Sequence, residues 1–262
     1  MASRVITLLT DFGLKDPYVG VMKGVIYGIN PYAIIVDLCH EIPRHDVNVA
    51  SIILQVSYRY FPKGTIHVCV VDPGVGTKRR SLLVKTRNYY FIGPDNGCLY
   101  CAVVDDGVEA VYDISNSPYR LRDISYTFHG RDLFSPIAAY LSIGVPPWRL
   151  GIEFTGELVK PSIEFPRVED GCIYGYIGYV DVFGNLMTNI RGVPWSFGDR
   201  LIVYNRGSPI ECLFERSFGY VSEGEYVCYI NSWGFLEIGV NKGSARDRSG
   251  LSIGDWVRVC RV

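Results

Sequence analysis

Three apolar, β-branched segments within the first 72 residues each run directly into an aspartate, and this pattern most constrains the fold. The segments end at Asp11, Asp37 and Asp72. Parallel strands that are buried on both faces read as continuous apolar segments of this kind, and ligands bind in the crevice beyond their carboxyl ends. The pattern therefore predicts an open α/β sheet with a site at that edge. The alternative, at any one position, is an acid that caps the following helix.

The pattern of predicted secondary-structure segments changes near residue 156. Before that point, strand-like segments alternate with helix-like segments, which is typical of an α/β domain. Afterwards, short β-rich segments are separated by Gly, Asn and Asp, which indicates a small all-β barrel or sandwich. The helix-like segments span 17–29, 46–60 and 131–143. We expect an α/β catalytic domain over residues 1–156, a linker over 157–167 and a smaller all-β, barrel-like domain over 168–262.

Composition limits the class of partner. The 262 residues are 48% apolar and 20% charged, so the chain is globular and long enough to bury a core. A net charge of −1, with no basic cluster larger than Lys78–Arg80, argues against nucleic acid and anionic lipid and favours a small molecule. The first apolar segment is too short for a signal peptide, and none approaches the ~18 apolar residues of a membrane span. We expect a cytoplasmic protein.

Eight cysteines in such a chain are expected to be reduced and buried, although disulfides occur in intracellular proteins of hyperthermophiles. Cys98 and Cys101 have the C-x-x-C spacing of zinc ligands. A structural zinc site also needs a second pair, or histidines at matching spacing, and the sequence has neither. We expect no metal site there.

A pool of acids and histidines remains for chemistry, and two mechanisms fit it. In the first, these side chains ligate a metal that activates water. In the second, Asp72, Arg79 and His129 orient and activate water by hydrogen bonding. His129 stands just before a helix, where it can point into a strand-end crevice, whereas His67 lies inside the third strand and is expected to be structural. The pool comprises Asp11, Asp16, Asp37, His40, His45, Asp72, Asp95 and His129.

Five separated motifs, in order, carry a resemblance over nearly the whole chain. They are LLTDFGLKDPYVG from Leu8, VDPGVGTKR from Val71, IGPDNG from Ile92, TFHGRD from Thr127 and VDVFGNLMTNI from Val180. The chain resembles the S-adenosyl-L-methionine hydroxide adenosyltransferases, which are related to fluorinating and chlorinating enzymes. The resemblance implies a Rossmann-like N-terminal domain, a β-barrel C-terminal domain and a homotrimer with the ligand between subunits. It also implies hydrolysis of S-adenosyl-L-methionine to adenosine and L-methionine, without a cofactor.

The resemblance also implies roles for individual residues. Asp72, Arg79 and His129 match the family's water-handling triad, although the adjacent Arg80 would replace Arg79 if the register shifted by one residue. The implied substrate contacts are Asp11 on the ribose diol, Asp16 near the methionine ammonium, Phe183 and Asn185 on adenine, Ser232 near the methionine carboxylate and Asn241 near adenine. Turn preference alone offers the alternative that Asn185 is a turn residue, and the match of the flanking residues favours the binding role.

The halogenating relatives differ at the triad. They carry tyrosine in place of the triad aspartate and replace the histidine-glycine pair, whereas this chain keeps Asp72, His129 and Gly130. A carboxylate beside the nucleophile position would repel a halide ion, which favours water as nucleophile. Two alternatives stay open: a metal-dependent hydrolase that uses Asp11, Asp37, Asp72 and His129, and a non-catalytic sensor of adenosine or S-adenosylmethionine.

Overall fold

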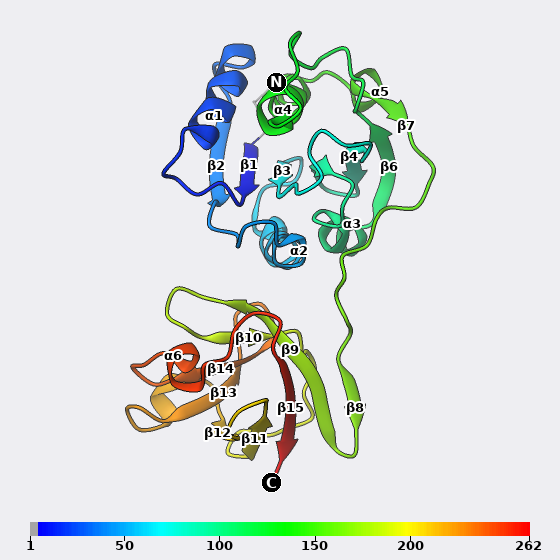
Figure 1. Cartoon of the computed structure of the whole chain (residues 1–262). Helices are drawn as coiled ribbons and strands as arrows, with labels where there is room; N and C mark the ends of the chain where they lie inside the picture. The colour runs from blue at the N-terminus through cyan, green and yellow to red at the C-terminus, as the bar shows by residue number, and fades with distance from the viewer. Residues whose placement is uncertain (1–4) are drawn as a thin grey trace. The chain divides into compact units, whose positions relative to one another are not determined.

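The chain folds into two compact units (Figure 1). The computed structural model describes residues 5–262, so the first four residues of the opening segment lie outside the described residues. The first unit ends at Ser162 and the second runs from Ile163 to Val262. This division falls inside the segment 157–167. No helix within residues 5–262 has the length and apolar character needed to cross a membrane.

The first unit contains a seven-stranded sheet in the order β2-β1-β3-β5-β4-β6-β7. The strands β2, β1, β3 and β5 are parallel, and β4, β6 and β7 extend the sheet with antiparallel pairings. The predicted α/β class is confirmed. The strands are β1 (Val5–Thr10), β2 (Ile34–Cys39), β3 (Ile66–Val70), β4 (Ser81–Thr86), β5 (Tyr90–Pro94), β6 (Val108–Asp113) and β7 (Ile152–Glu153).

Helices cover both faces of this sheet: α1 and α4 lie on one face, and α2 and α3 on the other (Figure 1). Because both faces are covered, the central strand β3 is buried along its whole length, His67 included, whereas the edge strand β2 is partly exposed. Asp46 caps α2 by accepting the Val49 N–H at 2.9 Å. The helices are α1 (Tyr18–Ile29), α2 (Val47–Ser57), α3 (Tyr100–Asp106), α4 (Ser135–Ser142) and α5 (Pro147–Leu150), and a π-helical turn (Gly130–Phe134) leads into α4.

The second unit is a closed β-barrel. The strands follow the order β10-β14-β13-β12-β11-β15-β9, and a β9–β10 pairing closes the ring of seven while β8 extends outside it. Alternate residues of β11 are buried, as a barrel interior requires. The strands are β8 (Arg167–Glu169), β9 (Cys172–Val180), β10 (Leu186–Thr188), β11 (Arg200–Tyr204), β12 (Ile210–Phe214), β13 (Tyr226–Ile230), β14 (Leu236–Val240) and β15 (Trp256–Arg261), and α6 spans Ala245–Ser249.

Two disulfides lie in the barrel, so the expectation of reduced cysteines is wrong for this unit. Cys172 on β9 pairs with Cys260 on β15, and Cys212 on β12 pairs with Cys228 on β13. The first pair consists of direct cross-strand partners whose Cα atoms are 4.4 Å apart, a separation within disulfide reach. Sequence spacing does not reveal such a pairing, because 88 residues separate the two cysteines.

Candidate active site

Two of the three strand-end aspartates reach one cavity. Asp11 follows β1 directly and Asp72 lies just beyond β3, and these strands are parallel neighbours. Both acids line a cavity of about 300 Å³. The sequence-predicted residues Asp16 and His129 line it too. The remaining lining residues are Phe12, Tyr18, Arg44, His45, Val70, Val75, Thr127, Phe128 and Gly130.

Asp37 does not line this cavity, so the expectation that all three acids face one ligand is wrong for this residue. It lies within β2, where it binds Lys23 Nζ at 2.6 Å and His40 Nε2 at 2.9 Å. The apolar segment stops at the aspartate, yet the pairing of β2 with β1 continues to Cys39 through a register shift. Backbone hydrogen bonding, which sequence patterning does not report, therefore extends the strand past the acid.

Arg79 uses all of its N–H groups inside the protein. Its Nε donates to Asp72 Oδ1 at 2.8 Å, and Nη2 donates to Asp72 Oδ2 and, at 2.9 Å, to His129 Nδ1. Its Nη1 donates to Ser81 Oγ at 2.5 Å and to the Arg80 carbonyl at 3.2 Å. A guanidinium has five N–H donors, so none is left for a ligand. Arg79 therefore fixes Asp72 and His129 rather than contacting a molecule in the cavity. Ser81, which the sequence did not single out, completes this arrangement.

The bond from Arg79 also determines the protonation of His129. A guanidinium only donates, so Nδ1 of the imidazole accepts and the ring proton sits on Nε2. Partial burial and then the Arg79 cation lower the pKa of His129 below its ordinary value of 6.5, against the opposing effects of Asp72 and Asp132. His129 is therefore a neutral ring that presents a donor, Nε2–H.

A glycine turn brings the two parts of this cluster together. The turn between Asp72 and Arg79 contains Gly76, whose φ is +76°. A Cβ at Gly76 would lie 2.2 Å from the Tyr126 carbonyl oxygen, so only glycine allows this close approach. The segment that contains Tyr126 leads directly to His129. Packing of the two loops thus depends on the second glycine of the VDPGVGTKR motif.

The neighbouring Arg80 has a different partner, and this separates it from Arg79. Its Nε donates to Asp95 Oδ2 at 2.9 Å, and its guanidinium carbon lies 4.5 Å from the centroid of the Phe154 ring. Asp95, from the predicted pool, also accepts the Val159 N–H at 2.9 Å. Arg80 and Asp95 therefore hold the 154–159 segment against the domain, and the arginine next to Asp72 and His129 is Arg79.

On the other side of the cavity, Asp11 is held by a backbone contact from an unusual residue. Asp11 Oδ2 accepts the His45 N–H at 2.9 Å, and His45 has φ +67°. The left-handed conformation aims this amide at the carboxylate. Asp16 is exposed at the rim.

Three aromatic rings form a wall of the same cavity. Phe12, Tyr18 and Phe128 have centroids 5.2–5.8 Å apart. Sequence reasoning did not single out any of the three, nor Arg44. The signal available for the rings was their position inside the LLTDFGLKDPYVG and TFHGRD motifs.

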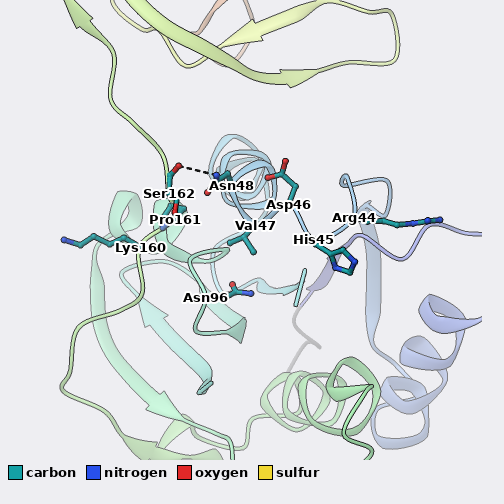
Figure 2. A pocket seen from close by; sticks show the side chains of 9 residues that line it. All are labelled: Arg44, His45, Asp46, Val47, Asn48, Asn96, Lys160, Pro161 and Ser162. Atoms are coloured by element: carbon teal, nitrogen blue, oxygen red, sulfur yellow. Dashed lines mark hydrogen bonds between the residues drawn. The ribbon is translucent and has the colours of Figure 1, made fainter. Parts of the chain in front are cut away.

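A second polar cavity, of about 500 Å³, adjoins the first and shares Arg44 and His45 with it (Figure 2). Lys160 and the α2 N-terminus form its other sides. Asn48 Nδ2 donates to the Ser162 carbonyl at 3.3 Å across it (Figure 2). His45 thus stands between two open volumes, which the sequence did not reveal.

In the barrel, three of the four predicted binding residues line one cavity of about 570 Å³. They are Phe183, Asn185 and Asn241. The Phe183 ring is 74% exposed, as a stacking surface for a ligand would be, whereas Asn185 is buried. Ser232 does not line this cavity; it is exposed in the turn between β13 and β14, at the opposite end of β14 from Asn241.

Asp181 organises the turn that carries Phe183 and Asn185. Its Oδ1 accepts the backbone N–H groups of both residues, at 3.0 and 2.8 Å, and its Oδ2 accepts Asn185 Nδ2 at 2.8 Å. Asn185 is therefore a turn residue and a cavity residue at once. One of the two Nδ2 hydrogens is engaged by Asp181, so the Asn185 amide has Oδ1 and a second N–H to offer to a ligand. The sequence analysis missed Asp181, although an acid that precedes Phe-Gly-Asn is typical of such side-chain-capped turns.

The arrangement of the candidate ligands bears on the metal-dependent alternative. Among residues 5–262, no group of three or more His, Cys, Asp or Glu side chains is placed to hold a metal ion. Asp37 belongs to a different network from Asp72 and His129, so the four proposed ligands do not converge.

Asp72 lies at the carboxyl end of a parallel strand, and Arg79 and His129 contact it or each other at the wall of a cavity. This arrangement is typical of an α/β enzyme that binds a small molecule at the edge of its sheet and acts on it with polar side chains. Family comparisons agree. The N-terminal domain of the SAM hydroxide adenosyltransferases matches residues 6–151, and their C-terminal domain matches residues 175–258. The chain belongs to the SAM hydroxide adenosyltransferase family.

Relatives match over nearly the full length. A protein named (R)-S-adenosyl-L-methionine hydrolase from Thermus thermophilus is 37% identical over 98% of this chain and 99% of its own. A protein of the same name from Salinispora tropica is 33% identical over 97% of each chain. A fluorinase from Nocardia brasiliensis is 26% identical over 97% of this chain and 96% of its own. A crystal structure of a conserved protein from Thermotoga maritima, 39% identical, superposes with a TM-score of 0.92 over 98% of this chain and 100% of that one.

Proposed function

We propose that this protein hydrolyses S-adenosyl-L-methionine to adenosine and L-methionine. The observation that carries the proposal is the Asp72–Arg79–His129 cluster at the wall of a strand-end cavity. Membership of the hydroxide adenosyltransferase family and the similarity to proteins named (R)-S-adenosyl-L-methionine hydrolase support the same substrate.

The proposed reaction is an in-line displacement at the 5′ carbon of the substrate. Oxygen of the water forms a bond to that carbon, the carbon–sulfur bond breaks, and its electron pair returns to sulfur. The leaving group is a neutral thioether, so no acid needs to protonate it. The enzyme's task is to orient water and to accept its proton. We propose that the reaction uses no cofactor, because water and a base suffice for this chemistry. We also propose that the protein is cytoplasmic.

The geometry favours a division of labour within the cluster. His129 has its Nδ1 lone pair occupied by Arg79, so it donates Nε2–H to the water oxygen and is not the base. Asp72 keeps carboxylate lone pairs beyond those that Arg79 uses, so Asp72 accepts the water proton. Arg79 holds both groups in place without touching the water. The sequence resemblance predicts a direct part for Arg79 in orienting water, and its fully engaged donors argue for this indirect part instead.

Substrate recognition is proposed to use both units. Asp11 accepts hydrogen bonds from the ribose diol, and Asp16 lies near the methionine ammonium. Phe183 stacks on adenine, and Asn185 and Asn241 hydrogen-bond to it. Ser232, proposed for the methionine carboxylate, lies outside the barrel cavity, so its role needs a ligand that extends along β14. We further propose a homotrimer in which the α/β unit of one subunit and the barrel of the next share each substrate.

The test is product analysis in ¹⁸O-labelled water. Purified protein is incubated with S-adenosyl-L-methionine, with and without a chelator, and the products are separated by chromatography and identified by mass spectrometry. We expect adenosine that carries one ¹⁸O, unlabelled methionine, and equal rates in both incubations. Rates abolished by the chelator would establish the metal-dependent alternative. Bound ligand without turnover would establish the sensor alternative.

A further inference from the structure

A chain of hydrogen bonds, buried at Thr10 and His40, runs from the partly exposed Lys23–Asp37 pair to the turn that carries Asp11. Thr10, the last residue of β1, is fully buried, and its hydroxyl contacts His40 Nδ1 at 2.8 Å. The His40 side chain is 2% exposed, and its Nε2 contacts Asp37 Oδ1 at 2.9 Å. Lys23 Nζ binds the other Asp37 oxygen at 2.6 Å. None of these four residues lines the cavity.

The hydrogen bonds from Phe12 through Thr10 and His40 all point toward Asp37, which also accepts from Lys23. An ionised carboxylate only accepts, so His40 donates Nε2–H to Asp37, and in this tautomer Nδ1 accepts the Thr10 hydroxyl hydrogen. The Thr10 oxygen accepts the Phe12 N–H at 3.2 Å. Although partial burial acts to raise the pKa of Asp37, hydrogen bonds from His40 and Lys23 hold it below its ordinary value.

His40 holds the turn a second time through its backbone. The Gly13 N–H donates to the His40 carbonyl at 2.7 Å, and Gly13 has φ +66°. The register shift between β1 and β2 at Leu8 and Leu9 directly precedes this contact. The Gly13 amide is thus held by His40 directly, and the Phe12 amide is held by the Thr10 hydroxyl that His40 Nδ1 contacts. Asp11 and Phe12, between Thr10 and Gly13, both line the cavity.

We propose that Thr10 and His40 are positioning residues for the substrate-binding turn Asp11–Gly13, and that Asp37 keeps His40 in the Nε2–H tautomer. This inference rests on the proposed function, because it takes Asp11 as a ligand of the substrate. It explains why Asp37, although it follows an apolar segment like the other two acids, lies outside the cavity. Asp37 orients the histidine that fixes the turn.

The chain offers a matched control for this proposal. Thr7 lies on the same strand, is equally buried, and its hydroxyl contacts a buried histidine, His67 Nδ1, at the same distance of 2.8 Å. Neither Thr7 nor His67 lines the cavity or holds the turn. Thr7→Val and Thr10→Val therefore remove the same type of hydrogen bond from the same strand, and only Thr10→Val releases the turn.

The kinetic arm compares KM with kcat. A turn that binds substrate and transition state alike changes KM, so we expect Thr10→Val to raise KM ~10-fold with kcat within ~3-fold, and Thr10→Ser and Thr7→Val to stay within ~3-fold in both. His40→Asn keeps an acceptor where Nδ1 stood and should resemble wild type. His40→Gln keeps the contact with Asp37, loses that acceptor, and should resemble Thr10→Val. Equal KM changes in Thr7→Val and Thr10→Val would show a purely structural role and overturn the proposal.

A second arm does not depend on activity. Hydrogen exchange of the Phe12 and Gly13 amides, followed by mass spectrometry, should accelerate ~10-fold or more in Thr10→Val and His40→Gln and remain unchanged in Thr7→Val, because local opening sets the exchange rate. Unchanged exchange in Thr10→Val would overturn the positioning role even if the enzyme is active. If wild-type protein releases no adenosine, the proposed function fails, and the exchange rates still decide whether Thr10 and His40 hold the turn.

Discussion

Arg79 Nη2 donates a hydrogen bond to His129 Nδ1 at 2.9 Å, and this contact fixes which imidazole nitrogen carries the proton. The same guanidinium grips both oxygens of Asp72. One cation thus holds a donor and an acceptor at the wall of one cavity. The roles assigned to these groups predict distinct effects of substitution.

Asp72→Asn and His129→Ala should lower kcat by ~100-fold or more while substrate affinity stays within a few-fold, because both groups act on the water. His129→Gln, which can still donate near the Nε2 position, should retain more activity than His129→Ala. Steady-state kinetics and calorimetric titration with substrate separate the two effects. If affinity falls in proportion to kcat, these residues bind the substrate and the assigned roles are wrong.

Acid should inactivate the enzyme through His129. The neutral ring accepts from Arg79, so protonation at Nδ1 breaks the cluster. Because the pKa of His129 is lowered from 6.5, the neutral ring persists below pH 6.5. We therefore expect kcat to be constant above pH 6.5 and to fall only at more acidic pH. Arg79→Gln removes the cation that lowers this pKa and leaves Asp72, which raises it. The acid limb of the kcat profile should therefore shift to higher pH in Arg79→Gln, and an unshifted limb would contradict the assignment.

Water should be the only effective nucleophile. In the proposed mechanism the Asp72 carboxylate lies beside the nucleophile, where it would repel a halide ion in a partly dehydrated cavity. Incubation with high chloride or fluoride should give adenosine and no 5′-halo-adenosine by mass spectrometry. A halogenated nucleoside as a major product of the wild-type protein would place this chain with its fluorinase relatives in activity.

The proposed homotrimer predicts that two inactive chains recover activity when they assemble together. Asp72→Asn disables the α/β unit and Asn185→Ala the barrel, and head-to-tail interfaces join unlike surfaces of neighbouring subunits. Random assembly of equal amounts should leave about a quarter of the sites intact. Co-refolded chains should regain activity that mixed, preformed trimers lack. No recovery in verified mixed trimers would show that each site is built within one chain.

His67 should make the fold sensitive to acid. Burial lowers the pKa of His67 to about 3 from 6.5, so the unfolded chain binds a proton in a pH range where the native protein does not. Above pH 6.5 this histidine does not lower the free energy of unfolding, and that free energy falls as the pH drops from 6.5 toward 3. Between pH 7 and pH 5 we expect a loss of ~2 kcal/mol from this group. Urea unfolding of wild type and His67→Phe at both pH values isolates it, and equal losses in the two proteins would refute the assignment.

Sequence patterning predicted much of the fold because its signals are local. Apolar segments before Asp11 and Asp72 indicate buried parallel strands, and the change to short β-rich segments near residue 156 indicates a second, all-β unit. The acids at the ends of β1 and β3 fall on the cavity because parallel neighbours share a carboxyl edge. Resemblance in five motifs then indicated the family.

Only the tertiary structure decided the positions and partners of side chains that depend on strand register and on the turns between strands. Asp37 carries the same local signal as Asp11, yet two further residues of pairing place it within β2 and beside His40. Arg79 and Arg80 are equivalent in sequence, and alternation along the chain before β4 sends one to Asp72 and the other to Asp95. The Cys172–Cys260 disulfide joins direct cross-strand partners, and Cys212–Cys228 links the neighbouring strands β12 and β13. Sequence separation does not predict these contacts, since Asp37 and His40 are three residues apart and Cys172 and Cys260 are 88 apart, and only the folded backbone sets their distances.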